Sequence, residues 1–287
     1  MSYLDYFLEI LKTKLINTGF VKEEEIINYG LPTIRKNFFT DMSDKTIEEY
    51  KKGDGKEFAK GDFKRIRSSA AMIFNLLGNE EVIIKPNSYL PSGNYKKEFE
   101  KKIKTVKRSS KKANLDACLY NEDCEIFIES KCLEWLQNGN KSLNEAYTQD
   151  TTRYYFPETA ELFRAIGKEI LLSQYDSGQM FRHTLAIYNY LKDSKKQLIN
   201  KKIYLLNVVW EPDEKELPEE IRSIYKHQLD LEHCEFDLFH KKMEPLIKII
   251  SDEIKNQFDI LYLSVKDFHS ILSYTDRNQK IFIKRYL

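Results

Sequence analysis

The chain has 287 residues, and its 46 Lys and Arg residues nearly balance its 45 Asp and Glu residues, for a formal net charge of +1. This balance excludes an overall polycation, so any affinity for a polyanion must come from local basic clusters. Hydrophobic residues make up 41% of the chain, enough for a sizeable core. No apolar run approaches the roughly 18 residues of a membrane span. The four cysteines form no disulfide framework and no secretory signal is recognisable, which predicts a cytoplasmic protein.

Hydrophobic periodicity predicts helices that alternate with strands. In chain order we expect a helix at 3–18, a polar loop at 41–63, a helix capped by Ser68 or Ser69 and ending at Gly78, a short strand at 81–86, a hairpin within 114–135, helices at 158–173 and 177–192, a buried strand at 203–210, a charged helix at 218–256, a strand at 258–264 and a helix beginning near Lys266. Strands alternating with long helices favour a layered α/β fold.

The segment 114–131 carries the clearest chemical signal. Its apolar and polar residues alternate with the period of a strand on both sides of a polar turn, which predicts a β-hairpin. If the turn is centred between Glu122 and Asp123, paired residue numbers sum to 245 and Asp116 lies opposite Glu129. Their Cβ atoms would then be about 5 Å apart. A shift of one residue would place them on opposite faces of the sheet.

Two opposed carboxylates on a half-buried sheet repel each other unless a cation offsets the repulsion. Mg²⁺, for which Mn²⁺ can substitute, is bound in this way by one or two carboxylates together with phosphate oxygens. Lys131 points to the same side as Glu129 and places an ammonium beside the metal-bound water. This arrangement suits phosphodiester hydrolysis, with Lys131 orienting or deprotonating the nucleophile. We therefore predict that Asp116, Glu129 and Lys131 are catalytic and that Asp116 and Glu129 bind the metal.

Asp116, followed by a hairpin and by Glu129-Ser130-Lys131, resembles the D…(E/D)xK signature of the restriction-endonuclease-like, or PD-(D/E)xK, nuclease superfamily. The helix RSSAAMIFNLLG upstream, and the helix QMFRHTLAIYNYL and strand IYLLNVVW downstream, are similar to the αβββαβ core of that superfamily. The SSxAxxFNLLG helix also resembles a bacterial group of type II restriction endonucleases. Two features depart from the pattern: Leu115 stands where the motif name has Pro, and Gln179 is followed four residues later by His183 instead of the Tyr of a QxxxY element.

The resemblance implies a restriction-endonuclease-like core with a mixed β-sheet flanked by helices at 64–212. An N-terminal helical and loop segment at 1–63 and a C-terminal helical extension with a late strand at 213–287 would be packed on this core as one domain. It also implies a Mg²⁺-dependent endodeoxyribonuclease that cuts double-stranded DNA, leaving a 5′-phosphate and a 3′-hydroxyl. The backbone carbonyl of Ser130 would be a further metal ligand. The expected partners are a second copy of the chain and a cognate DNA methyltransferase in the host, with no membrane.

The stretch 96–112 holds nine Lys or Arg residues against two Glu, a local net charge of +7. It is interpreted either as a solvated loop or helix face, or as a surface that contacts phosphates, in which case binding should weaken steeply with salt. The N-terminus of a helix also favours anions. The candidate DNA contacts from these arguments are Lys107, Arg108, Lys111, Lys112, Ser69 and Gln179.

Two other hypotheses remain open at this point. One is a DNA repair or mobile-element nuclease with the same fold, which would prefer branched or single-stranded DNA. The other is a non-catalytic nucleic-acid-binding module, in which Asp116, Glu129 and Lys131 form an ordinary cross-strand ladder of surface charges. Binding of Mg²⁺ or Mn²⁺ discriminates between the enzyme and the module, because a surface ladder should bind neither ion specifically.

Overall fold

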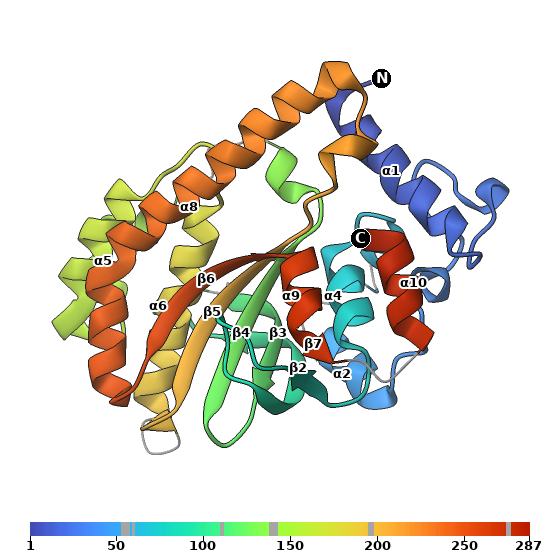
Figure 1. Cartoon of the computed structure of the whole chain (residues 1–287). Helices are drawn as coiled ribbons and strands as arrows, with labels where there is room; N and C mark the ends of the chain where they lie inside the picture. The colour runs from blue at the N-terminus through green and yellow to red at the C-terminus, as the bar shows by residue number, and fades with distance from the viewer. Residues whose placement is uncertain (53–57, 59–60, 110–111, 138–142, 195–197, 274–276) are drawn as a thin grey trace.

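The structure is a computed structural model that describes residues 1–52, 58, 61–109, 112–137, 143–194, 198–273 and 277–287. Its centre is a curved β-sheet with helices on both faces (Figure 1). The strands are β1 Val82–Ile84, β2 Gly93–Ile103, β3 Ala113–Tyr120, β4 Cys124–Lys131, β5 Lys202–Val209, β6 Phe258–Ser264 and β7 Leu272–Ser273. The α-helices are α1 Tyr3–Asn17, α2 Asp44–Lys52, α4 Ser69–Leu77, α5 Pro157–Glu169, α6 Ser177–Asp193, α8 Glu219–Ile254, α9 Val265–Ile271 and α10 Arg277–Tyr286.

The seven strands form one sheet in the order β6-β5-β4-β3-β2-β1-β7. The strands β4, β5 and β6 are parallel, whereas the pairs on the other side of β4 are antiparallel, so the sheet is mixed. Helices α5, α6 and α8 cover one face, and α1, α2, α4, α9 and α10 lie over the other, with an apolar core between the sheet and each layer. This is the α/β architecture of a restriction-endonuclease-like core that the sequence predicts.

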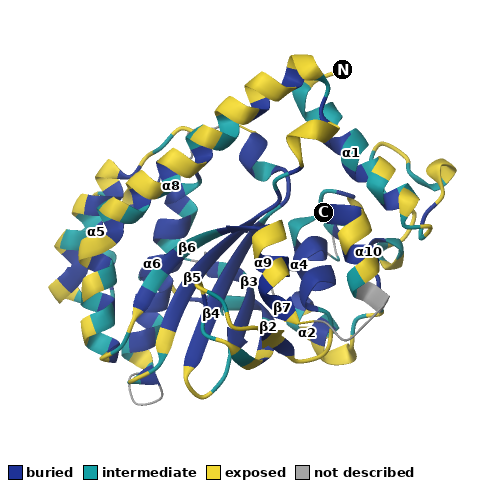
Figure 2. Cartoon of the chain, viewed as in Figure 1, coloured by how far each residue is buried: buried dark blue, intermediate teal, exposed yellow. Residues whose placement is uncertain are grey.

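Burial on both faces explains the apolar character of the central strands. Every residue of β5 except Lys202 is buried, as expected for a parallel strand covered by helices on each side. Figure 2 shows the strands as the darkest, most buried part of the molecule. The helix at α4 is capped by the Ser68 side chain, which accepts a hydrogen bond from the Ala71 N–H, and it stops at Gly78, as predicted.

The hairpin of β3 and β4 has the predicted register. The ladder runs from Ala117 opposite Ile128 to Tyr120 opposite Glu125, so that paired residue numbers sum to 245. The ladder ends at Ala117 and Ile128, and Asp116 and Glu129 are the residues next to this last pair on the two strands. Because β3 and β4 are antiparallel, the beginning of β3 and the end of β4 lie at the same end of the sheet.

The basic stretch 96–112 is not the loop or helix face that its charge suggested, because its first part is strand β2 at the centre of the antiparallel half of the sheet. Tyr95 and Phe99 point into the core from this strand. Lys97 lies on the same face, where it is 9% exposed and donates a hydrogen bond to the Glu80 carbonyl oxygen. The aliphatic part of a lysine side chain can be buried like an apolar residue. A pattern that counts lysine only as charged therefore misses the strand alternation here.

The polar segment 41–63, expected to be a loop, contains helix α2, so this prediction is wrong for its central part. The helix is fastened to the sheet by Tyr50, which is fully buried. The Tyr50 ring stacks on Phe99 of β2 at a centroid distance of 5.4 Å and meets the edge of Phe63 at 4.9 Å. This aromatic anchor, together with the hydrogen bond that Glu49 Oε2 accepts from the Phe99 N–H, holds an otherwise charged helix in place.

The C-terminal helix is attached to the N-terminal part of the chain by a buried guanidinium. Arg285 of α10 has no exposed surface, and it donates hydrogen bonds to the Asn37 carbonyl and side-chain oxygens and to the Ile66 carbonyl oxygen. Burying a charge is costly unless hydrogen bonds compensate for the lost water. Arg285 thus ties the C-terminus to two segments near the N-terminus. Among the described residues, none of the helices is both long and apolar enough to cross a membrane.

Candidate active site

The predicted motif residues meet at one end of the β3–β4 hairpin. Asp116 is half-buried near the start of β3, and Glu129 and Lys131 lie on one face at the end of β4. Ser130 points to the other face, and its backbone N–H and hydroxyl donate hydrogen bonds to Asp116 Oδ2 over 2.6 and 2.7 Å. The Asp116 carboxylate is therefore hydrogen-bonded to the residue next to Glu129, which fixes Asp116 against the end of β4.

Glu129 is held by three side chains and is 4% exposed. Its Oε1 accepts hydrogen bonds from Lys131 Nζ at 2.6 Å and from Gln179 Nε2 at 2.7 Å. Its Oε2 lies 2.9 Å from His183 Nε2. Gln179 and His183 are four residues apart at the start of α6, so that both reach Glu129 from the same helix face.

Lys131 is the charged centre of this network. Its Nζ donates to Glu129 Oε1 and to Gln179 Oε1, each at 2.6 Å. Burial by itself would lower the pKa of Lys131, but the negative charges of Glu129, Asp176 and Glu134 outweigh it and raise this pKa above its ordinary value. Burial would likewise raise the pKa of Glu129, but Lys131 and then His183 lower it to about 2. The pair is therefore an ammonium and a carboxylate at neutral pH.

The strand geometry changes at Asp116. Leu115 belongs to the core beneath α5, α6 and α8, whereas Ala117, two residues later, belongs to the opposite core, so the usual alternation is interrupted between them. Opposite this point on β2 stands Glu100, which has a left-handed backbone with a φ of 55°. A positive φ is uncommon for a residue other than glycine, and strain of this kind clusters at functional sites. Glu100 is buried and accepts a hydrogen bond from the Asn114 side chain.

The electrostatics of Asp116 favour a nearby cation. Burial first, and then the negative charges of Glu129 and Glu100, raise the pKa of Asp116 well above its ordinary value. A divalent cation would offset this repulsion, and the donors at hand, two carboxylates and backbone oxygens, are those that Mg²⁺ prefers. Among the described residues no group of three His, Cys, Asp or Glu converges as a metal cage. The donor set suits an ion that also takes substrate and water oxygens.

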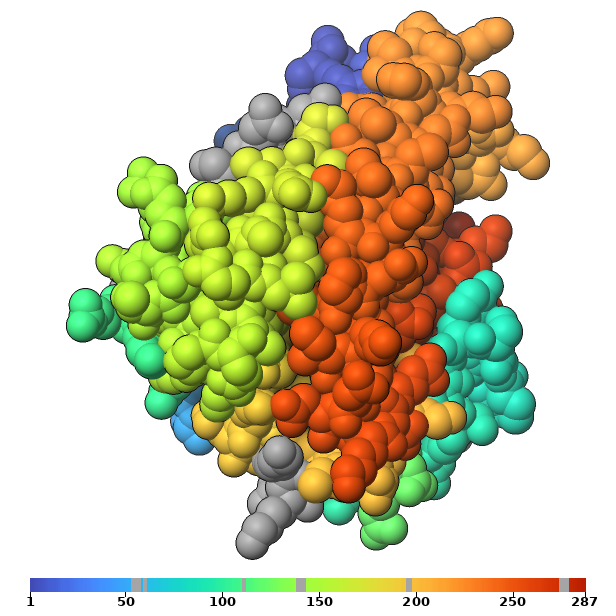
Figure 3. Space-filling model, turned by 90° about the vertical axis from the view of Figure 1, so that its left-hand side faces the viewer, coloured from blue at the N-terminus to red at the C-terminus, as the bar shows by residue number. Residues whose placement is uncertain are grey.

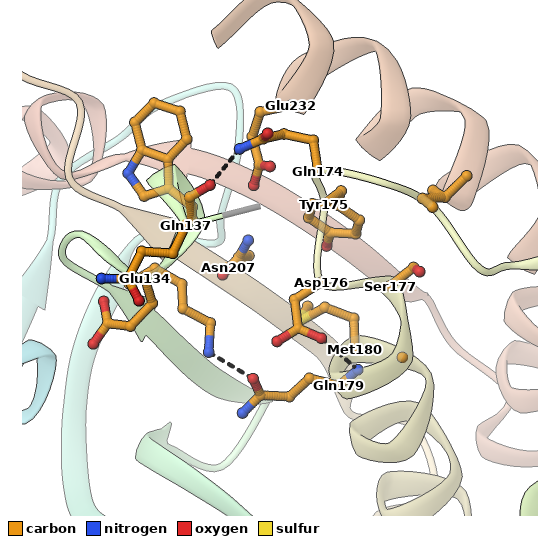
Figure 4. A pocket seen from close by; sticks show the side chains of 14 residues that line it. Glu134, Gln137, Gln174, Tyr175, Asp176, Ser177, Gln179, Met180, Asn207 and Glu232 are labelled. Atoms are coloured by element: carbon orange, nitrogen blue, oxygen red, sulfur yellow. Dashed lines mark hydrogen bonds between the residues drawn. The ribbon is translucent and has the colours of Figure 1, made fainter. Parts of the chain in front are cut away.

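A polar pocket opens beside Lys131 (Figure 4). Its lining comes from Lys131 at the end of β4, residues of the segments 134–137 and 172–180, Asn207 of β5 and Glu232 of α8. Asn207 is the parallel-ladder neighbour of Glu129, and it is 3% exposed. Burial, followed by the charge of Glu235, raises the pKa of Glu232 to about 8. The pocket extends the site from the sheet toward α8.

Most of the candidate DNA contacts lie near this end of the sheet. Lys107 and Arg108 lie in the turn that follows β2, and the exposed Lys112 directly precedes β3, so all three are near the end of the hairpin that carries Asp116. Lys111 lies outside the described residues. Ser69 begins α4, and its carbonyl oxygen lies 3.3 Å from Ser130 Oγ.

A family model described as Restriction Endonuclease associating with ARP (REase-ARP) matches residues 17–287 of this chain. The chain belongs to this family. REase-ARP membership makes it a restriction-endonuclease-like nuclease with DNA as its substrate, and the mixed sheet flanked by helices agrees with that family. Comparison with curated proteins and with solved structures finds no significant match.

Three site residues were not recognised from the sequence. The sequence identifies His183 as a departure from the QxxxY element but not as a partner of Glu129, whereas the structure places its Nε2 within hydrogen-bonding distance of Glu129 Oε2. Glu100 was counted as part of a basic stretch, although it stands beside Asp116. Glu232 lies more than a hundred residues from the motif. The helical spacing of Gln179 and His183 is a usable signal, whereas nothing local identifies the other two.

Proposed function

We propose that this chain is a Mg²⁺-dependent endodeoxyribonuclease that hydrolyses phosphodiester bonds of double-stranded DNA as a type II restriction endonuclease. The observation that carries the proposal is the meeting of Asp116, Glu129 and Lys131 at one end of a hairpin. Asp116 accepts hydrogen bonds from Ser130, the residue between Glu129 and Lys131, and the Lys131 ammonium donates one to Glu129. A solvated ladder of surface charges would not be buried, nor would it be surrounded by Gln179 and His183.

In this proposal Asp116, Glu129 and the Ser130 backbone carbonyl hold Mg²⁺. When bound, the ion supplies an acidified water and neutralises charge on the phosphate. Lys131 acts as an ammonium: its raised pKa keeps it protonated, so it orients the attacking water and stabilises negative charge instead of removing a proton. Gln179 orients both Glu129 and Lys131, and His183 fixes the other carboxylate oxygen of Glu129.

DNA would approach this end of the sheet along the basic turn. Lys107, Arg108 and Lys112, with Lys111 from the same stretch, are proposed to contact backbone phosphates, and Ser69 and Gln179 to contact DNA near the cleaved bond. Because cutting both strands of a duplex calls for two active sites, the proposed active form is a symmetric homodimer. A cognate DNA methyltransferase would protect host DNA, and both proteins would work in the cytoplasm.

Cleavage of methylation-free plasmid and phage DNA in the presence of Mg²⁺ or EDTA tests the proposal. Discrete fragments that require Mg²⁺ and disappear in Asp116→Asn would support it. Asp123→Asn is the matched control, because Asp123 is exposed in the turn of the same hairpin and the chemical change is identical. A metal-dependent smear or nick would point instead to a repair or mobile-element nuclease. No cleavage, with no binding of Mg²⁺ or Mn²⁺ in calorimetry, would refute an enzyme and favour a binding module.

A further inference from the structure

A carboxylate of the long C-terminal helix holds the segment that leads into α6. Glu235 of α8 is 9% exposed, and both of its oxygens face the segment 173–175. Its Oε1 accepts hydrogen bonds from the Ser173 N–H at 3.1 Å and the Ser173 hydroxyl at 2.6 Å. Its Oε2 accepts from the backbone N–H groups of Gln174 and Tyr175 at 2.8 and 2.9 Å. One side chain thus satisfies three consecutive backbone amides.

Aromatic contacts fasten the same segment to the same helix. The Tyr175 ring lies 5.6 Å from the Phe236 ring and 5.4 Å from the Phe239 ring, measured between centroids. Figure 3 shows α8 (orange) lying directly beside the yellow-green part of the chain that includes α5. Because α8 also packs against β6 and α6, it is a firm support for the segment 173–175.

The segment 173–175 leads directly to the residues that orient the catalytic pair. Asp176 caps α6, since its Oδ1 accepts a hydrogen bond from the Gln179 N–H at 3.2 Å. The Gln179 side chain then bridges Lys131 and Glu129 at 2.6 and 2.7 Å. A shift of the start of α6 therefore moves Gln179 relative to both motif residues. Displacements of about 1 Å at a site of this kind can cost about 100-fold in rate.

We propose that Glu235 is a positioning residue for the nuclease reaction: by holding the segment 173–175 it fixes the start of α6, so that Gln179 keeps Lys131 and Glu129 in place. The inference rests on the proposed function for its effect on catalysis, and it assigns a role to α8 in the active site. It predicts coupling between two residues that are not in direct contact, Glu235 and Gln179.

A double-mutant cycle tests this coupling through kinetics. Glu235→Ala should lower kcat by about 10- to 100-fold while leaving KM and DNA binding nearly unchanged. Glu235→Gln, which keeps one acceptor oxygen, should recover part of the loss. In a Gln179→Ala background, Glu235→Ala should cost less than about threefold, because the same link is already broken. Asp237→Asn, a like change at an exposed position of α8, should behave as wild type. Independent, multiplying losses from Glu235→Ala and Gln179→Ala would overturn the proposal.

Hydrogen exchange provides a readout that does not depend on cleavage. The amides of residues 173–179 should exchange faster in Glu235→Gln and Glu235→Ala, with no change in Asp237→Asn, because three of them lose a carboxylate acceptor. Unchanged protection of the Gln179 amide would refute the positioning role even if the protein cut no DNA. Conversely, a wild-type protein without nuclease activity but with the expected exchange pattern would refute the proposed function and preserve the structural link.

Discussion

Replacing Glu129 by Gln should destabilise the protein by about 3 kcal/mol at pH 7 in the absence of divalent ions. The pKa of Glu129 falls from 4.5 to about 2 in the folded chain, because Lys131 and His183 outweigh the effect of burial. At about 1.4 kcal/mol per pH unit, this shift corresponds to about 3 kcal/mol of stabilisation of the ionised form. Glu129→Gln removes that charge and leaves the Lys131 ammonium buried without its closest partner.

Urea unfolding followed by circular dichroism in EDTA measures this cost. The double variant Glu129→Gln/Lys131→Met should regain most of the lost stability, since neither charge then remains buried. Glu122→Gln, in the exposed turn of the same hairpin, is the control and should be neutral. Because the folded pKa is lowered, the contribution is complete above about pH 4.5 and disappears as the pH falls toward 2. Equal stabilities of wild type and Glu129→Gln at pH 7, or a double variant as unstable as the single one, would refute the reasoning.

Three further predictions concern other parts of the chain. His183→Ala, which removes a 2.9 Å contact to Glu129, should lower kcat at least about 10-fold with unchanged DNA binding, and an unaltered cleavage rate would contradict this. Arg285→Met should lower the free energy of unfolding by about 3 kcal/mol, and lower Tm, because the buried carbonyl oxygens of Asn37 and Ile66 lose their donor. An unchanged Tm would contradict a stabilising role for Arg285. Burial lowers the pKa of Lys97 to about 8, so the unfolded state binds more protons between about pH 8 and 10.5. The stability of wild type relative to Lys97→Met should therefore rise across that window in urea titrations, and parallel pH profiles would refute it.

Local patterns in the sequence were sufficient for much of the fold. The alternation on both sides of residues 121–123 predicts the hairpin and its register, because side-chain direction in a strand repeats every two residues. The observed ladder, from Ala117 opposite Ile128 to Tyr120 opposite Glu125, has that register. The strand Phe258–Ser264 and the helix Ser177–Asp193 also lie where periodicity placed them, since burial of one face or of both faces leaves a direct mark on composition.

Only the tertiary structure decided how the site is completed. Strand β2 is not evident from the sequence, because its many Lys and Glu residues hide the alternation of buried and exposed positions. Its pairing with β3 and the packing of Tyr50 on Phe99 depend on residues that are distant in the sequence. The contact of Glu129 with Gln179 spans 50 residues, and the contact of Ser173 with Glu235 spans 62. No local pattern encodes such pairs, because hydrogen bonds between remote segments depend on how helices pack on the sheet. The sequence alone therefore predicts the motif residues Asp116, Glu129 and Lys131, whereas the packing of α6 and α8 on the sheet determines which distant side chains contact them.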